Sequence, residues 1–149
     1  MFCRSCDRPI YENPIPATCL VVHNSKGQLL LVKRSVEPKK GQWCLPGGFI
    51  ELGEAPDKGA LRELAEETGL EADDAFLLGV RTTPNSQYHS VLMVGYLVHD
   101  YKGILESGDD AEQVAWFPQK HLPPIAFESH LHFIHCYLTS LKTIEPLPH

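Results

Sequence analysis

The sequence predicts an α/β fold in which a mixed β-sheet is sandwiched between helices (α/β/α). Apolar, β-prone segments bounded by turn residues recur along the chain. One segment with helical start and stop signals interrupts them near the middle, and a second with helical periodicity follows them near the end. With 149 residues, 43% of them hydrophobic, the chain has room for one core and little for a second.

The first two expected strands flank a turn. Residues 17–23 (ATCLVVH) and 28–33 (QLLLVK) are apolar and β-prone, and residues 24–27 between them have turn chemistry. We therefore expect these two segments to form a β-hairpin. Residues 1–16 contain three prolines, which cannot donate to a strand ladder, so they are expected to form an irregular arm before the domain.

A glycine-rich strand and a helix are expected next. Residues 43–50 (WCLPGGFI) predict a short strand interrupted by a Pro-Gly-Gly sequence, where the backbone can approach a ligand closely. Residues 56–68 start with a proline, which suits the first helical turn. Gly69 follows them and suits the left-handed position after the last turn, so this segment predicts a helix.

The second half of the chain supplies the remaining elements. Residues 76–81, 90–99 (SVLMVGYLVH) and 113–117 (QVAWF) are predicted strands, with a loop over 82–87. A final helix is expected over about 127–142, because apolar residues recur there at helical spacing: Phe127, Leu131, Ile134, Leu138 and Leu141. The domain would then span 17–143, and residues 144–149 would form a tail.

The composition argues against long nucleic acids and membranes as partners. The formal net charge is -6, with 13 basic against 19 acidic residues and no run of Lys and Arg. No stretch approaches the roughly 18 to 20 apolar residues that span a bilayer, and the first residues lack the apolar core of a secretion signal. We expect a cytoplasmic protein that binds a small phosphorylated molecule.

The helix expected over 56–68 carries three carboxylates on one side. At about 100° per residue, Glu63, Glu66 and Glu67 share a wedge roughly 100° wide, away from the apolar face. Like charges at this spacing repel each other, whereas Mg²⁺ binds through a few carboxylates together with the phosphates of a substrate. The alternative is the solvated acidic face of an ordinary surface helix.

The wider spacing decides between these two interpretations. Gly48 is followed after five residues by Glu54 and, after seven more, by RELAEETGL at 62–70. This pattern matches the Nudix box at every specified position, with Leu64 and Leu70 at its two aliphatic sites. The chain therefore resembles the Nudix hydrolases over roughly residues 17–141, with the box at 48–70.

The resemblance implies a role for each residue of the box. In that family the carbonyl of the preceding glycine, here Gly47, and the three helix glutamates coordinate Mg²⁺ or Mn²⁺. Glu54 and Arg62 resemble the pair whose salt bridge orients the metal cluster. The implied reaction is attack of water on a phosphorus of a nucleoside diphosphate that is linked to another moiety.

The general base is left open by the sequence. In the Nudix family it is either a box glutamate, here Glu63, or a glutamate on a loop near the end of the sheet. Glu112, in the sequence GDDAE ahead of QVAWF, is the favoured loop candidate, and Glu106 and Glu128 are weaker ones.

The substrate is indicated by weaker similarities. Pro84 resembles the proline placement of Nudix ADP-ribose pyrophosphatases, and LPPIAF at 122–127 resembles a region of zinc-ribbon Nudix enzymes that act on ADP-ribose and FAD. Phe49 and Tyr88 are further candidates for contact with the substrate. We therefore expect an ADP conjugate such as ADP-ribose or FAD.

Other functions stay open at this point. The Ser-Gln-Pro-Trp-type stretch that marks NADH pyrophosphatases is missing, which disfavours NADH. Hydrolysis of nucleoside triphosphates or dinucleoside polyphosphates is an alternative, and so is a nucleotide-sensing module without activity, although such modules typically lose box carboxylates. RNA decapping is disfavoured by the acidic balance. The resemblance to ADP-ribose-cleaving members favours a homodimer.

The five cysteines are expected to be reduced thiols. Cys3 and Cys6 resemble the second half of a zinc ribbon, but a structural zinc site needs four ligands and we expect no partner knuckle upstream. A degenerate knuckle is therefore favoured over a zinc site that another chain or a distant residue completes. The remaining three are expected to be buried: Cys19, Cys44 and Cys136.

The histidines of the final helix are expected to have surface or packing roles. His130, His132 and His135 lack the four-residue spacing with which two histidines share a metal on one helix face. His132 and Cys136 do have that spacing.

Overall fold

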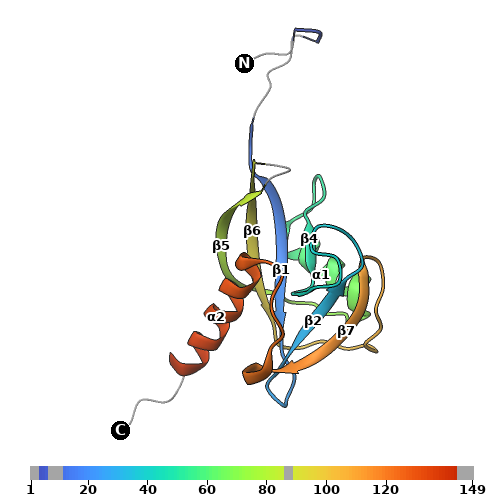
Figure 1. Ribbon diagram of the computed structural model, residues 1–149, viewed down its shortest axis with the longest axis vertical. Helices are drawn as coiled ribbons and strands as arrows, with labels where there is room; N and C mark the ends of the chain where they lie inside the picture. The colour runs from blue at the N-terminus through green and yellow to red at the C-terminus, as the bar shows by residue number, and fades with distance from the viewer. Residues whose placement is uncertain (1–3, 7–11, 86–88, 144–149) are drawn as a thin grey trace.

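The computed structural model describes residues 4–6, 12–85 and 89–143, which form two β-sheets and two long helices (Figure 1). The four-stranded sheet has the order β4 (Gly47–Phe49), β1 (Ile15–Val22), β6 (His89–Val98) and β5 (Phe76–Asn85). It is mixed, because β1 runs parallel to β6 while its other pairs are antiparallel. The antiparallel three-stranded sheet has the order β3 (Trp43–Cys44), β2 (Gln28–Arg34) and β7 (Ala111–Pro118).

The helices α1 (Pro56–Thr68) and α2 (Glu128–Thr143) lie on opposite sides of the strands (Figure 1). Alternate residues of β1 face opposite cores: Cys19 and Val21 pack with α2, and Leu20 and Val22 pack with α1. The central strands are apolar without interruption because both of their faces are buried. The predicted α/β/α class is confirmed.

The boundaries of both helices agree with the prediction to within a residue. Pro56 occupies the first turn of α1, and Gly69 ends the helix with φ 77° while its N–H donates to the carbonyl of Ala65 at 3.0 Å. A short 3-10 turn, Gln119–His121, links β7 to the segment that leads into α2. Within the described residues, no helix has the length and apolarity needed to cross a membrane.

The predicted hairpin of the first two strands is wrong in its pairing. β1 and β2 form an antiparallel bridge at His23 and Leu29, around a turn in which the Asn24 side chain accepts from the N–H groups of Lys26 and Gln28. Beyond that bridge they join different sheets. Both β1 and β2 are buried on their two faces, so packing against both cores determines which strands pair with them. The turn between β1 and β2 does not determine this pairing alone. β1 also starts at Ile15, earlier than expected.

The predicted loop over 82–87 is wrong for its first four residues. β5 continues to Asn85, with Thr82 opposite Leu92 and Pro84 opposite Ser90. β5 is an edge strand, so one side of its backbone needs no donor and proline is tolerated there. Residues 86–88, which include Tyr88, lie outside the described residues.

A pair of glycines makes room for the largest buried side chain of the core. Gly79 and Gly95 lie opposite each other on β5 and β6, beneath the fully buried ring of Phe133 from α2. A Cβ atom on Gly95 would lie 2.5 Å from the Phe133 ring, whereas one on Gly79 would lie at 3.5 Å, an ordinary contact. The close approach of α2 to the sheet therefore depends on Gly95.

The Gly95→Ala substitution is expected to lower the free energy of unfolding by about 1–3 kcal/mol, because the buried Phe133 ring must leave its rotamer or the helix must move. The matched Gly79→Ala substitution should cost less than about 1 kcal/mol. Urea unfolding monitored by circular dichroism compares the two. Equal losses in both variants would contradict this account of the packing.

Candidate active site

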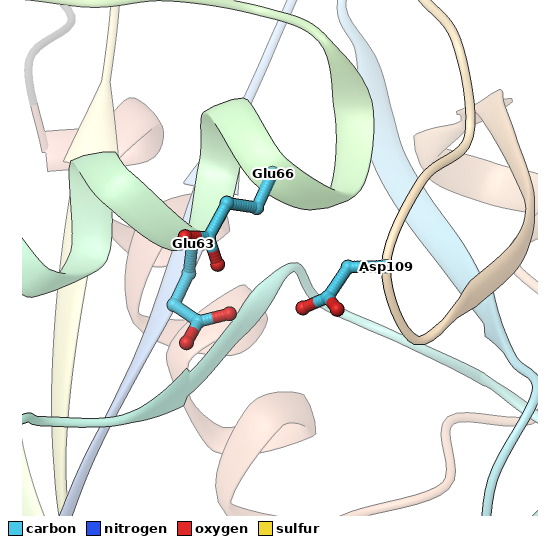
Figure 2. A group of neighbouring side chains, drawn as sticks. All are labelled: Glu63, Glu66 and Asp109. Carbon is cyan, nitrogen blue, oxygen red and sulfur yellow. The ribbon is translucent and has the colours of Figure 1, made fainter.

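Three carboxylates from two separate segments point toward one another beside β4. Figure 2 shows Glu63 and Glu66 projecting from α1 toward Asp109, which comes from the loop before β7. One carboxylate oxygen from each residue lies within 4.8 Å of the other two. Carboxylate oxygens are the ligands that hard divalent cations prefer, so this donor set fits Mg²⁺ or Mn²⁺.

The carboxylate of Glu63 rests against the backbone of β4. A Cβ atom on Gly48 would lie 2.7 Å from the Glu63 carboxyl carbon, so a side chain at Gly48 would displace the carboxylate. Gly47 is equally constrained, because a Cβ there would overlap the carbonyl oxygen of Thr18. Of the two glycines predicted for close approach, Gly48 therefore lets α1 lie directly on β4, and Gly47 lets β4 lie close to β1.

Asp109 is held at the site by hydrogen bonds from its loop. The N–H of Gly108 donates to the carbonyl of Glu67 at 3.1 Å, which attaches the loop to the last turn of α1. On the other side, the N–H of Ser35 donates to the carbonyl of Asp110 at 2.9 Å. Asp109 itself has φ 50°, a left-handed conformation that aspartate tolerates better than most residues.

The sequence identified this loop but favoured a different acid in it. Glu112 is exposed and follows the first residue of β7, beside the irregularity in its pairing with β2. Among the described residues, Asp109 and Asp110 of this loop line the cavity at the site, and Glu112 does not. Glu106 is exposed, and Glu128 lines the cavity but is paired with Arg81 at 2.8 Å.

Arg62 connects the acidic residues. Its Nε and Nη2 donate to the two oxygens of Glu54 at 2.7 and 3.0 Å, which is the predicted salt bridge in bidentate form. Its Nη1 donates to Glu63 at 3.0 Å and to Glu66 at 3.1 Å. The hydrogen bonds from Arg62, followed by one from the backbone of Glu51, lower the pKa of Glu54 to about 2.

Glu67 is the most buried of the three helix glutamates. Its exposed fraction is 7%, because the acidic side of α1 packs against β4. Burial, followed by the charge of the neighbouring Glu63, raises the pKa of Glu67 to about 9. Burial also raises the pKa of Glu63, which is hydrogen-bonded to Glu67. Near neutral pH, the two carboxyl groups can share a proton that a bound cation would displace.

A cavity of about 750 Å³ extends from the carboxylates to the start of α2. Phe49, which is half exposed, and Pro84 both line it, as their prediction as substrate-binding residues requires. Its far wall includes two residues that the sequence did not predict, Arg34 and His130. The Nε of Arg34 donates to the carbonyl of Pro38 at 2.6 Å, and its guanidinium lies over the Phe127 ring.

His130 is nearly fully buried, so of the expected surface or packing roles the structure favours packing. The N–H of Leu45 donates to its Nδ1 at 3.1 Å, and its ring contacts that of Phe127. Burial, followed by the charge of Arg34, lowers the pKa of His130 to about 3. The sequence contained no signal for this position, since helical periodicity indicates which face is buried but not whether a cavity lies beneath it.

The cysteines divide into buried and exposed groups. Cys19 and Cys44 are buried, as predicted, while Cys136 is only partly buried, with its Sγ 3.5 Å from Nε2 of His132. Cys6 is exposed, and Cys3 lies outside the described residues. The degenerate zinc knuckle therefore stays a prediction.

The family model described as the NUDIX domain matches residues 13–136, which is most of the chain. The chain belongs to the Nudix family. Its helix α1 with the loop before it is the Nudix box, and the family accounts for the glutamates gathered around Arg62.

Relatives and solved structures support this assignment. The ADP-ribose pyrophosphatase of Methanocaldococcus jannaschii is 35% identical over 120 residues, which cover 80% of this chain and 70% of the relative. An NAD-capped RNA hydrolase of Vibrio vulnificus, NudC, is 28% identical, and the match covers 85% of this chain but only 47% of that relative. The NUDIX domain of Shewanella oneidensis NrtR, solved with ADP ribose, is 26% identical with a TM-score of 0.77 and coverages of 88% and 90%.

The protonated state of Glu67 predicts how stability depends on pH in the metal-free protein. A folded-state pKa above the unfolded value of about 4.5 means that folding retains a proton which the unfolded chain has lost. Stability should therefore fall as pH rises from 6.5 to 8, by up to about 1.4 kcal/mol per pH unit. His130 is uncharged in the folded state throughout this range.

Urea unfolding of the metal-free protein at several pH values measures this slope, and the Glu67→Gln variant should flatten it. Added Mg²⁺ should stabilise the wild type more at pH 8 than at pH 6.5. A variant with the same slope as the wild type would show that Glu67 is ionised in the folded protein.

Proposed function

We propose that this protein hydrolyses a nucleoside diphosphate linked to another moiety, with Mg²⁺ or Mn²⁺, and that ADP-ribose is its preferred substrate. The observation that carries the proposal is the convergence of Glu63, Glu66 and Asp109 at one end of a cavity of about 750 Å³. The cluster can hold a cation, and the cavity has the size of typical ligand pockets.

The chain's own residues divide the work of the reaction. The carboxylates of Glu63, Glu66 and Glu67, with the carbonyl of Gly47, would hold the cation, and Asp109 extends this set from the opposite loop. A divalent cation at this place neutralises phosphate charge and lowers the pKa of a bound water. Arg62 fixes two of these carboxylates and is itself fixed by Glu54.

The chemical step needs one proton acceptor. The oxygen of water forms a bond to one phosphorus, the bridging P–O bond breaks, and the proton of the water moves to a carboxylate. Glu63 is our first assignment for this base because it lies at the centre of the cluster. Asp109 is the loop alternative that the geometry favours, and Glu112 is the loop alternative that the sequence favoured.

The choice of ADP-ribose is supported from two directions. The Methanocaldococcus relative is named as an ADP-ribose pyrophosphatase, and the domain from Shewanella was solved with ADP ribose. The cavity walls include Phe49 and Pro84, and the position of Pro84 in the sequence resembles the proline placement of Nudix ADP-ribose pyrophosphatases. A sensing module without activity is disfavoured because this chain keeps Glu63, Glu66 and Glu67. The name of the Vibrio relative makes NAD-linked substrates the next to test.

The Glu66→Gln variant should lower kcat at least about 100-fold, because the negative charge of a metal ligand and of its ion pair with Arg62 is lost. Hydrolysis with Mg²⁺ would be followed by chromatography of the phosphate-bearing products of ADP-ribose, FAD, NADH, diadenosine polyphosphates and nucleoside triphosphates in parallel. Faster cleavage of triphosphates than of ADP-ribose would overturn the substrate ranking. No cleavage of any of them by the wild type would refute the proposed activity.

A matched pair of variants separates the loop acids. Asp109→Asn should reduce kcat by about 10-fold or more, while Glu112→Gln, three residues away on the exposed side of the loop, should leave kcat within about 2-fold. Single-turnover hydrolysis of ADP-ribose measures both. The reverse result would assign the loop function to Glu112 and remove Asp109 from the cluster.

We further propose that the protein acts in the cytoplasm as a homodimer. Support for a dimer comes from the edge strand β5, where Phe76, Leu77 and Val80 are each more than half exposed. Light scattering after gel filtration should give a molecular mass twice the 16.7 kDa of the chain. The Val80→Lys substitution should lower the measured mass toward that of the monomer. A monomeric wild type at micromolar concentration would contradict the dimer.

A further inference from the structure

One buried side chain of the cavity wall has a hydrogen-bonding group that no residue within 4–6, 12–85 and 89–143 satisfies. His130 lies in the first turn of α2, and its exposed fraction is 6%. Its Nδ1 accepts from the backbone N–H of Leu45 at 3.1 Å. Among the residues that the structure describes, none hydrogen-bonds its second ring nitrogen, Nε2.

The second nitrogen is open to the cavity. Among the described residues, every fully enclosed side-chain nitrogen and oxygen has a hydrogen-bond partner, so Nε2 must retain some accessible surface. Because His130 is one of the residues that line the cavity, that surface faces the cavity. Nε2 is therefore placed to hydrogen-bond a molecule that enters the cavity.

The hydrogen bond from Leu45 also fixes what Nε2 can do. A neutral imidazole carries one proton, and Nδ1 must be the unprotonated nitrogen because it accepts from a backbone N–H. The proton is therefore on Nε2. Burial and the nearby Arg34 keep the ring neutral. His130 consequently presents a fixed, uncharged N–H donor, and in this tautomer it can be neither a metal ligand nor a general base.

The surroundings of His130 suit a flat, largely apolar group. The Phe127 ring centroid lies 5.0 Å from that of His130, and the buried side chains of Val91 and Met93 line the same cavity. Glu63 and Asp109 of the carboxylate cluster line the same cavity, and the diphosphate is expected beside them. Of the parts of a nucleotide, the base combines a planar apolar surface with ring acceptors.

We propose that His130 is a specificity-determining residue whose Nε2–H donates a hydrogen bond to an acceptor on the nucleobase of the substrate. The proposal rests on the proposed function, since it takes a nucleotide as the substrate. For an adenine nucleotide the base acceptors are its ring nitrogens, so one of these receives the hydrogen bond.

Two substitutions separate the donor from the structural hydrogen bond. In His130→Asn the side-chain oxygen can replace Nδ1 as the acceptor for Leu45, but nothing reaches the position of Nε2. In His130→Gln the terminal amide can reach the position of Nε2, while the contact with Leu45 is lost. His132→Asn is the matched control, because His132 lies on the same helix, hydrogen-bonds Arg81 and does not line the cavity.

The His130→Asn variant should lower kcat/KM for ADP-ribose by about 10-fold or more, chiefly through KM, because binding loses a buried hydrogen bond. His130→Gln should recover most of this loss although its melting temperature falls. His132→Asn should stay within about 2-fold of the wild type. Equal kcat/KM for the wild type and His130→Asn would overturn the proposal.

Substrate analogues test the same bond without altering the protein. ADP-ribose in which one adenine ring nitrogen is replaced by CH, at position 1, 3 or 7 in turn, would be compared with the parent compound. One analogue should be about 10-fold poorer for the wild type and no poorer for His130→Asn. If all three analogues matched the parent compound in the wild type, the proposal would be wrong. If the wild type cleaved no nucleotide at all, the proposed function would fail first, and chromatography of the monophosphate products shows that separately.

Discussion

The hydrogen bonds of one guanidinium group hold the active site in place. Arg62 donates to Glu54, Glu63 and Glu66, and its Nη1 lies 3.6 Å from Glu51. Without this positive charge, Glu63 and Glu66 would repel each other one helical turn apart. Glu54 fixes Arg62 from outside the helix through a bidentate contact, so the guanidinium orients the carboxylates instead of following their motion. The order of the site therefore depends on the loop before α1 as much as on the helix.

The positive charge of Arg62 compensates the negative charges of Glu63 and Glu66 more than that of the buried Glu67. Glu67 lies beneath the helix, away from these hydrogen bonds, and burial favours its neutral form. The metal-free site is thus balanced by Arg62 on one side and by a retained proton on the other. A divalent cation can replace that proton, because it supplies the charge that the buried carboxylate lacks. Cation binding would then be coupled to the release of the proton from Glu67.

Sequence patterns predicted the features that are formed by residues close to one another in the chain. The start and stop signals at Pro56 and Gly69 predicted α1 and its limits, and the resemblance to the Nudix box implied the pair of Glu54 with Arg62. Contacts between distant segments were harder to predict. The acidic loop was recognised, but which of its carboxylates faces the helix depends on how Gly108 docks onto α1. The apolar strands β1 and β2 were also predicted, but the packing on both of their faces determines which strands they pair with. Pro84 was assigned to a loop because the sequence does not show that it lies on an edge strand.

The division of the cavity explains why the box alone cannot identify the substrate. On the proposed function, the box supplies Glu63, Glu66 and Arg62, which meet the diphosphate, a group common to every proposed substrate. The cavity residues that could distinguish the attached groups come from elsewhere: Arg34 from the end of β2, Phe127 from just before α2 and His130 from its first turn. These elements are separate from α1 in sequence, so they can vary while the box stays the same. Arg34 is close enough to the buried Glu67 for its charge to act on that carboxyl, whereas His130 makes no hydrogen bond or ring contact with the cluster among the described residues, so a substitution at His130 should alter KM more than kcat.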